Sequence, residues 1–302
     1  MYNYSIIIPH RNTPDLLQRC IDSIPLREDL QIIIIDDNSD VSKVNFDVFP
    51  GCDRTNVEVY FCKYSGGAGA ARNIGLSMAK GAWIIFADAD DVFDTNTFNE
   101  CMDKYVKNDD DIIYFNAELV DVETNVTDSN FEYTKHIKRG KSSDEKWVRY
   151  MFTNPWARFV KHSFINTHNI CCDETIAGND AMFSLKCGYY AKKIIIDTST
   201  IYYWLLRRKG NITSNISETA IMDRFDVAVR MNKFKYDHNI NSKYRTNLYA
   251  MFLKVLHVVG MSYFDAFVFI TKKTNPRYVI MDLVSFVCSY MQRHIKMKFR
   301  YV

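Results

Sequence analysis

Three carboxylates follow an apolar run in the segment Phe86-Ala-Asp88-Ala-Asp90-Asp91. Two acids separated by one residue point to the same side of an extended segment. Carboxylate oxygens placed in this way suit Mg²⁺ or Mn²⁺, which proteins often bind jointly with the phosphates of a substrate. A solvated turn or a helix N-cap would produce the same pattern, but the position after a predicted strand favours a ligand site.

A second acidic pair, Asp36 and Asp37, follows another apolar run and precedes Asn38-Ser39. A carboxylate at the end of a strand can accept a hydrogen bond from a base N–H or a ribose hydroxyl. An Asx-turn is the alternative for this pair taken alone. Two acidic strand ends in one sheet favour a binding site.

A glycine-rich segment lies between the two acidic motifs, from Ser65 to Gly75. It resembles the dinucleotide-binding fingerprint only in part, because Arg72 stands where the third glycine is needed and the segment follows a third predicted strand. An NAD site is therefore disfavoured. Flexible glycines that lead into a helix still let backbone N–H groups and the guanidinium of Arg72 approach a phosphate or a base.

The elements that must position these residues alternate between strand and helix. Apolar runs and helical spacing predict strands at 5–9, 31–36, 57–62 and 82–87 and helices at 14–24 and 68–80. This order predicts a doubly wound α/β domain with a Rossmann-like, mostly parallel twisted sheet flanked by helices. Such sheets bind ligands at the carboxyl ends of their strands.

The rest of the chain has a less regular pattern. We predict a helix near 95–107, a strand at 111–115, a polar connection to about 146, a helix and a strand within 147–159, and a second α/β cycle at 179–197. Beyond about residue 216 the pattern is mostly helical, and one apolar stripe runs from Ile280 to Ile295. Composition alone places a domain boundary there.

Composition and charge exclude several classes of protein. The chain has 302 residues, and 47% of them are hydrophobic, so it can bury a core and is not disordered. Residues 1–233 carry 27 basic and 33 acidic residues, whereas residues 234–302 carry 11 and 3. An anionic partner would therefore bind the basic C-terminal region. Nucleic-acid binding is disfavoured, because the larger part is acidic and has no aromatic and basic recognition motif.

The cysteines and apolar segments indicate a cytoplasmic protein. The eight cysteines are scattered without Cys-x-x-Cys spacing, which favours reduced and mostly buried thiols. The first residues lack the basic region and the small-residue cleavage site of a secretory signal. Lys254, Asp265 and Asp282 interrupt the richest apolar stretches before they reach the ~20 residues that cross a bilayer.

Four segments, taken together, resemble the nucleotide-sugar half of family 2 glycosyltransferases with the GT-A fold. They are Ser5-Ile-Ile-Ile-Pro-His-Arg-Asn, Ile35-Asp-Asp-Asn-Ser-Asp, Gly69-Ala-Ala-Arg-Asn-Ile-Gly and Phe86-Ala-Asp-Ala-Asp-Asp. The resemblance is specific over about residues 1–120 and looser to about 215. It implies a catalytic domain at 1–215, with nucleotide-sugar binding in 1–120 and the acceptor side in 121–215, and a helical, basic C-terminal region at 216–302.

The resemblance implies residues for the donor site. They are Pro9, Arg11 and Asp37 for the nucleoside, Asp88 for the ribose, Asp90 with Asp88 for Mn²⁺ or Mg²⁺, and Arg72 for a phosphate or base. One departure is the pair His10-Arg11, where the family usually has an aromatic residue before the asparagine. This departure affects the expected contact with the base.

Sugar transfer also needs a base that takes the proton of the acceptor hydroxyl. The family usually supplies it from a Glu-Asp pair that opens a helix, and Ala177-Gly-Asn179-Asp180-Ala-Met-Phe is similar, with Asn179 in place of the glutamate. Asp180 is therefore the predicted general base, and Asn179 is a predicted acceptor contact. Capping of the helix by Asp180 is the alternative.

Two further segments resemble parts of the family's site. Pro155-Trp-Ala-Arg158 resembles the strand that lines the acceptor pocket, so Trp156 and Arg158 are predicted acceptor contacts. A tryptophan in the core is the alternative. The segment from Tyr202 to Ser214 resembles the loop that closes over the donor diphosphate, where Arg207 and Arg208, with Lys209, would neutralise the leaving group. A surface basic cluster is the alternative there.

The resemblance implies an inverting, metal-dependent transferase of bacterial polysaccharide assembly. The expected donor is a UDP-linked hexose or N-acetylhexosamine, and the acceptor is a saccharide or a lipid-linked saccharide. The alternatives are a non-catalytic nucleotide or carbohydrate-binding module and a sugar nucleotidyltransferase, although Pro9-His-Arg-Asn lacks the glycines that a nucleotidyltransferase needs after its first strand. The basic tail could rest on the anionic inner face of the plasma membrane or pack onto the catalytic domain.

Overall fold

The computed structural model describes residues 2–128, 131–206, 217–273, 275, 277, 278, 280 and 281. The chain divides into two compact units, Met1–Thr175 with Asn179–Ile212 and Ile176–Gly178 with Thr213–Val302. The predicted diphosphate loop, with Arg207, Arg208 and Lys209, and most of the apolar stripe and basic tail lie outside the described residues.

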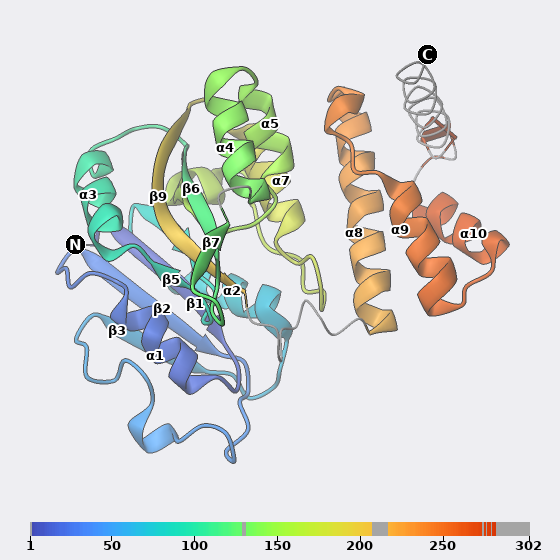
Figure 1. The fold of residues 1–302 in the computed structure, drawn as a ribbon. Helices are drawn as coiled ribbons and strands as arrows, with labels where there is room; N and C mark the ends of the chain where they lie inside the picture. Colours follow the sequence, from blue (N-terminus) through green and yellow to red (C-terminus); the bar gives the residue numbers. More distant parts are fainter. Residues whose placement is uncertain are drawn as a thin grey trace. The chain divides into compact units, whose positions relative to one another are not determined.

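The described part of the first unit contains one nine-stranded sheet (Figure 1). The strands run in the order β3 (Val57–Phe61), β2 (Leu30–Asp36), β1 (Tyr4–His10), β4 (Trp83–Phe86), β8 (Arg158–Lys161), β6 (Ile112–Asp121), β9 (Ile194–Leu206) and β5 (Val92–Phe93), with β7 (Val126–Asp128) paired to β6. All four strands predicted in the first 90 residues are therefore confirmed.

The strands β3, β2, β1 and β4 are parallel, as the sequence predicts. Their central members are continuous apolar runs, and every residue of β2 is buried, because helices cover both faces of a parallel sheet. Beyond β4 the sheet is mixed: β8 is antiparallel to β4 and β6, β9 is parallel to β6, and β5 is antiparallel to β9. The α/β fold class is confirmed, with a parallel part and a mixed part.

The helices of the first unit follow the strands in sequence. They are α1 (Pro14–Asp22), α2 (Gly67–Met78), α3 (Thr95–Tyr105), α4 (Glu132–Ser142), α5 (Glu145–Met151), α6 (His162–Thr167) and α7 (Ala181–Tyr190), with a 3-10 turn at Phe46–Val48. The prediction of a polar connection up to residue 146 was wrong, because 132–142 form α4. This mostly polar helix buries Ile137 and Gly140 and packs on β6 and β9, so tertiary contacts stabilise it.

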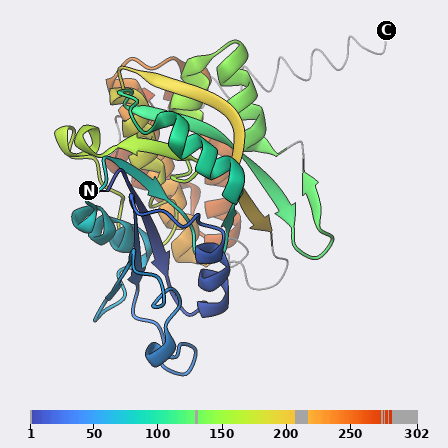
Figure 2. The same ribbon diagram turned by 90° about the vertical axis from the view of Figure 1, so that its left-hand side faces the viewer.

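An aromatic core joins the parallel and the mixed parts of the sheet. The ring of Phe159 on β8 lies 4.6 Å from that of Phe115 and 5.5 Å from that of Tyr4, measured between ring centroids. The strand β9 pairs with β6 over most of its length, with a register irregularity near Asn116, and it curves strongly in both views (Figures 1 and 2). Its C-terminal half thereby reaches the acidic segment after β4.

The second unit is helical in its described part, as the sequence predicts. It contains α8 (Glu218–Asp237), a 3-10 turn at Ser242–Tyr244, α9 (Leu248–Lys254), a π-helical turn at Val255–Val259 and α10 (Tyr263–Lys273). Ser217 caps α8 by accepting a hydrogen bond from the N–H of Ala220. The unit has its own small apolar core, which includes Phe225 and Val255. No helix in the described ranges is long and apolar enough to cross a membrane.

Candidate active site

The two acids that follow β2 have different environments. Asp36 is buried and accepts hydrogen bonds from the N–H and the hydroxyl of Ser39. The N–H of Thr13 donates to Nε2 of His10, so the proton is on Nδ1 and is donated to Asp36 over 2.8 Å. Burial raises the pKa of Asp36, but the hydrogen bonds from His10 and Ser39 outweigh it and leave this pKa below the usual value. Asp36 thus links the end of β1 to the turn that follows β2.

Asp37 instead faces the glycine-rich segment. Its Oδ1 accepts from the N–H of Gly66 at 2.7 Å, and its Oδ2 accepts from the N–H of Gly67 at 3.0 Å and from the hydroxyl of Ser65 at 2.7 Å. Arg11 donates to the same hydroxyl at 2.8 Å and lies 4.0 Å from Oδ2 of Asp37. Two predicted nucleoside residues, Arg11 and Asp37, therefore meet at the start of α2. The third, Pro9, lies half-buried near the end of β1.

Arg72 links two of the predicted site residues. Its side chain is 5% exposed; Nη2 donates to Oδ1 of Asp88 and Nη1 donates to Oδ1 of Asn179, both at 2.6 Å. Burial lowers the pKa of Arg72, but the carboxylates of Asp88 and Asp180 raise it further and the net shift is upward. One guanidinium therefore joins the segment after β4 to the residues that open α7.

The three acids after β4 also differ. Asp91 is buried and accepts from the hydroxyl of Tyr202 and from the N–H of Leu205, each at 2.9 Å. Burial raises its pKa well above the usual value, and the charges of Asp88 and Asp90 add to the shift. The side chain of Asp88 is 33% exposed, and Asp90 is half-buried. Asp91 is thus tied to β9, and Asp88 and Asp90 are the acids that reach solvent.

Asp88 and Asp90 fit one mode of metal binding. Among the described residues, no group of three His, Cys, Asp or Glu side chains could hold a metal ion. Mg²⁺ and related cations are commonly bound through one or two carboxylates, with substrate phosphates and water as the other ligands. Two partly exposed acids fit that mode, in which a bound substrate completes the coordination.

Asp180 stands directly before α7, where the sequence predicts a base or a cap. In the described structure its side chain makes no capping hydrogen bond to α7, so the capping alternative is not supported. Burial raises the pKa of Asp180; Arg72 opposes the shift, Asp88 adds to it, and Arg158 opposes it. A carboxylate with a raised pKa is suited to accept a proton near neutral pH.

Trp156 and Arg158, the predicted acceptor contacts, are both buried in this structure. Trp156 is 2% exposed, and its ring stacks on Tyr202 with a centroid distance of 5.1 Å. Arg158 is 1% exposed and donates to the backbone carbonyls of Phe152 and Asn154. The rings of Tyr133 and Phe152 also pack against Trp156. Both side chains are therefore enclosed in this structure, and the acceptor contacts predicted for them stay predictions.

Three residues of the site were not among the predicted ones. Ser65 connects Arg11 to Asp37. Asn73, the residue after Arg72, exchanges two hydrogen bonds with the backbone of Cys172. The hydroxyl of Tyr202 accepts from the N–H of Asp88 and donates to Asp91. Ser65 and Asn73 lie within the glycine-rich motif, which was the available signal.

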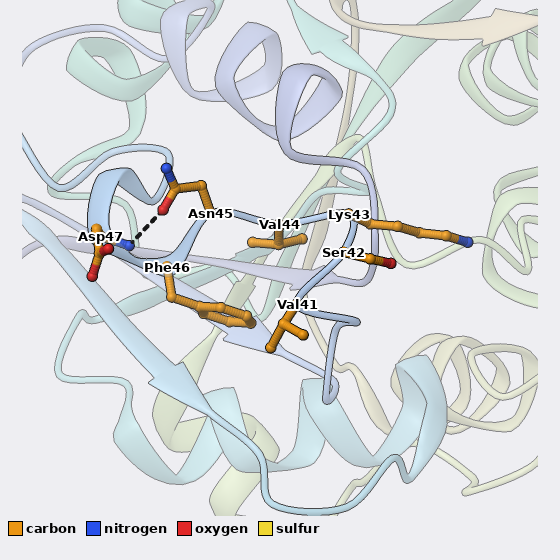
Figure 3. Close-up of a pocket in the computed structure, with 7 residues that line it drawn as sticks. All are labelled: Val41, Ser42, Lys43, Val44, Asn45, Phe46 and Asp47. Carbon is orange, nitrogen blue, oxygen red and sulfur yellow. Dashed lines mark hydrogen bonds between the residues drawn. The ribbon is translucent and has the colours of Figure 1, made fainter.

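A pocket of about 480 Å³ lies in the loop that follows β2 (Figure 3). All of its lining comes from this loop, and Asn45 within it accepts a hydrogen bond from the N–H of Asp47 at 3.0 Å. Phe46, which also lines it, packs against Phe49 and Phe61. The lining residues are Val41, Ser42, Lys43, Val44, Asn45, Phe46 and Asp47. The pocket thus lies further along the loop than Asp37, and none of the predicted site residues that the structure describes lines it.

The fold and the site define the class of protein. Acidic strand ends of a parallel sheet lie beside the glycine-rich start of α2, and the sheet continues into mixed strands, of which β9 binds the buried Asp91. This is the arrangement of GT-A transferases. Residues 5–166, just over half of the chain, match Glycosyl transferase family 2, and the chain belongs to this family.

Relatives and solved structures agree with this assignment. The chain is 28% identical over 212 residues to a poly(ribitol-phosphate) beta-glucosyltransferase of Bacillus spizizenii, covering 68% of this chain and 32% of that protein. It is 25% identical over 224 residues to glycosyltransferase GlyG of Streptococcus pneumoniae, covering 69% and 72%. The chain thus spans about a third of the length of the first relative.

The fold is also similar to that of a solved structure. The crystal structure of TarS 1–349 from Staphylococcus aureus in complex with UDP-GlcNAc matches with a TM-score of 0.60 and 18% identity. The match covers 77% of this chain and 66% of that one. At this identity the likeness concerns the fold.

Proposed function

We propose that the protein transfers a hexose or an N-acetylhexosamine from a UDP-sugar to a hydroxyl of a saccharide or lipid-linked saccharide during polysaccharide assembly. The observation that carries this proposal is the Arg72 guanidinium, which binds Asp88 on one side and Asn179, the neighbour of Asp180, on the other. It brings a donor carboxylate and a base together. The names of the relatives support the reaction, and the UDP-GlcNAc complex of TarS supports the donor class.

The donor side would use residues from the ends of three strands. Arg11 and Asp37 meet at the start of α2, where their guanidinium and carboxylate would bind the polar groups of a nucleoside. Asp88 would bind the ribose. Asp90, together with Asp88, would hold Mn²⁺ or Mg²⁺, which when bound offsets the charge of the diphosphate. Arg207 and Arg208, which lie outside the described residues, would contact the leaving diphosphate.

The reaction would be a single displacement. Asp180 takes the proton of the acceptor hydroxyl while the hydroxyl oxygen attacks the anomeric carbon. The bond between that carbon and the diphosphate oxygen breaks, and its electron pair leaves with the nucleoside diphosphate. Attack opposite to the leaving group inverts the anomeric centre. The raised pKa of Asp180 makes it a stronger base than an exposed aspartate.

The test is donor binding and turnover with UDP-, GDP- and dTDP-sugars in the presence of Mn²⁺, Mg²⁺ or EDTA. We expect one donor to be hydrolysed or transferred in a metal-dependent way. Asp90→Ala should lose donor binding, and Asp180→Asn should keep binding but lose at least about 100-fold in turnover. The control is Asp109→Asn, which changes an exposed acid.

Three outcomes would contradict the proposal. Binding of a donor without turnover by the wild-type protein would support the alternative of a non-catalytic binding module. Formation of a sugar nucleotide from a nucleoside triphosphate and a sugar phosphate would identify a nucleotidyltransferase. A wild-type protein that binds no donor under any metal condition would overturn the proposal as a whole.

A further inference from the structure

The first half of α2 contacts the loop that leads into α7. Asn73 donates to the carbonyl of Cys172 at 3.0 Å and accepts from the N–H of the same residue at 2.9 Å. At Gly69 the approach is closest: a Cβ there would lie 1.9 Å from the carbonyl oxygen of Asp173 and 2.9 Å from Cβ of Asn179. Helix α2, whose start lies beside Asp37, therefore fixes the path of the backbone that leads to Asp180.

Arg72 lies between these two contacts and divides its donors between two partners. A buried arginine and a carboxylate commonly pair through two parallel hydrogen bonds, which is the stronger geometry. Here only Nη2 binds Asp88, and Nη1 binds Asn179. Within the described residues Nε is buried without a hydrogen-bond partner. The guanidinium is therefore placed to connect two segments.

The neutral amide of Asn179 suits this connection. Asn179 is buried, and its Oδ1 is taken up by Arg72. An amide oxygen accepts the hydrogen bond without adding a charge, so the cation remains shared between Asp88 and Asp180. With its oxygen engaged, Asn179 is better placed to anchor the chain than to contact an acceptor.

We infer that Arg72 is a positioning residue that fixes the base-bearing start of α7 to the donor carboxylate Asp88, with Asn179 as its anchor. The inference rests on the proposed function and goes beyond it, because it gives Arg72 and Asn179 a role in the rate of the reaction. Asn179 should then affect the rate at saturating donor far more than it affects donor affinity. Arg72 touches both sides and should affect both quantities.

The experiment is a double-mutant cycle with Asn179→Ala and Arg72→Lys. Donor affinity is measured by calorimetry with the UDP-sugar that the wild type hydrolyses, and the rate is that of hydrolysis at saturating donor. Water as the acceptor excludes any effect of lost contacts to a saccharide. The matched control is Ser77→Ala, an exposed position on α2.

We expect Asn179→Ala to bind the donor within about twofold of wild type and to lose about tenfold or more in rate, because small misplacement of a catalytic group is costly. The double variant should lose less than the product of the two single losses, since both remove the same link. Ser77→Ala should behave as wild type. Thermal unfolding followed by circular dichroism verifies that each variant is folded.

The results separate this inference from the proposed function. An active wild type whose Asn179→Ala variant keeps the full rate would overturn the inference alone, and so would losses that multiply independently. The Asn179→Ala result decides the matter even where Arg72→Lys does not fold. A wild type that hydrolyses no donor would overturn the proposed function and this inference with it.

Discussion

Adjacent aspartates of one motif have different environments in this protein. Asp36 is bound by His10 and Ser39, whereas Asp37 accepts from three groups of the glycine-rich segment. In the same way Asp91 is enclosed while its neighbour Asp90 is only half-buried. In the first pair both acids are buried, and their different hydrogen-bond partners distinguish them. In the second pair burial separates the roles, because an enclosed carboxylate with its acceptors occupied has little capacity left for a ligand.

The raised pKa of Asp180 predicts a particular pH dependence. A general base works only when ionised, so the rate at saturating donor should fall as the pH falls through the pKa of Asp180. Because that pKa is raised, the fall should be centred above the ordinary aspartate value of 3.8. The measurement is the rate between about pH 3 and pH 8, on the order of one value per half unit.

Two variants make this prediction specific. Asp180→Asn should lose most of the rate, and the remaining rate should no longer fall at low pH. Asp109→Asn should keep both the rate and its fall at low pH. If the rate of the wild type falls around a pH at or below the ordinary aspartate pKa, burial does not raise the pKa of Asp180 in the working enzyme.

Asp37 predicts a combined effect on stability and donor binding. Asp37→Ala removes the acceptor of Ser65, Gly66 and Gly67, and partly buried N–H groups without a partner cost about 1 to 3 kcal/mol. We expect a loss of this size in the free energy of unfolding in urea, and weaker donor binding by calorimetry. The control Asp40→Ala, at an exposed acid of the same loop, should change both quantities little. Unchanged donor affinity in Asp37→Ala would remove Asp37 from the donor site.

At the scale of elements, the site depends on one long strand from late in the sequence. β9 runs beside β6 and ends next to the acidic segment after β4. Its Tyr202 accepts from the N–H of Asp88 and donates to Asp91, and its Leu205 donates to Asp91 through the backbone. The turn that presents Asp88 and Asp90 is therefore held in shape by β9.

This arrangement predicts the effect of removing a single hydroxyl. Tyr202→Phe should lower the free energy of unfolding by about 1 to 3 kcal/mol, because it leaves the buried Asp91 with one acceptor unsatisfied. Tyr203→Phe is the matched control on the same strand, since its partner Asp94 is only partly buried. Urea unfolding of both variants is the measurement. If Tyr202→Phe has the same free energy of unfolding as Tyr203→Phe, the contact with Asp91 stabilises the fold no more than the contact with Asp94.

At the scale of the whole molecule, the N-terminal and C-terminal parts of the chain differ in secondary structure and in charge. The first unit holds the sheet and the described site residues, and the second is helical in its described part. Residues 234–302 carry 11 basic and 3 acidic residues. Clusters of lysine and arginine beside apolar residues bind anionic lipid surfaces.

The basic region therefore predicts binding to anionic vesicles. The full-length chain should float with vesicles that contain phosphatidylserine, and less with neutral phosphatidylcholine vesicles. The variant Lys296→Gln, Lys298→Gln and Arg300→Gln should lose several-fold in bound fraction, because each charge near such a surface contributes about 1 kcal/mol. The control changes three lysines of the first unit, Lys43, Lys107 and Lys192. Equal flotation of the two triple variants would argue against the tail as a membrane contact.

The amino-acid sequence by itself determined the parallel part of the sheet, the helices α1 and α2, the acidic strand ends and the family. These features are local, since a buried strand is a short apolar run and the carboxylate motifs lie next to the strands that present them. The predicted donor residues Asp37 and Asp88 could be named from such motifs. Asp180 was named through the resemblance of a short segment.

Only the tertiary structure decided which of these side chains face solvent and which are enclosed. Trp156 is buried against Tyr202 of β9, and α4 is a helix because β6 and β9 offer it a surface. The link from Asp88 through Arg72 to Asn179 joins residues up to 107 positions apart in the chain. Contacts of this kind leave no local pattern, because they depend on which distant elements pack together.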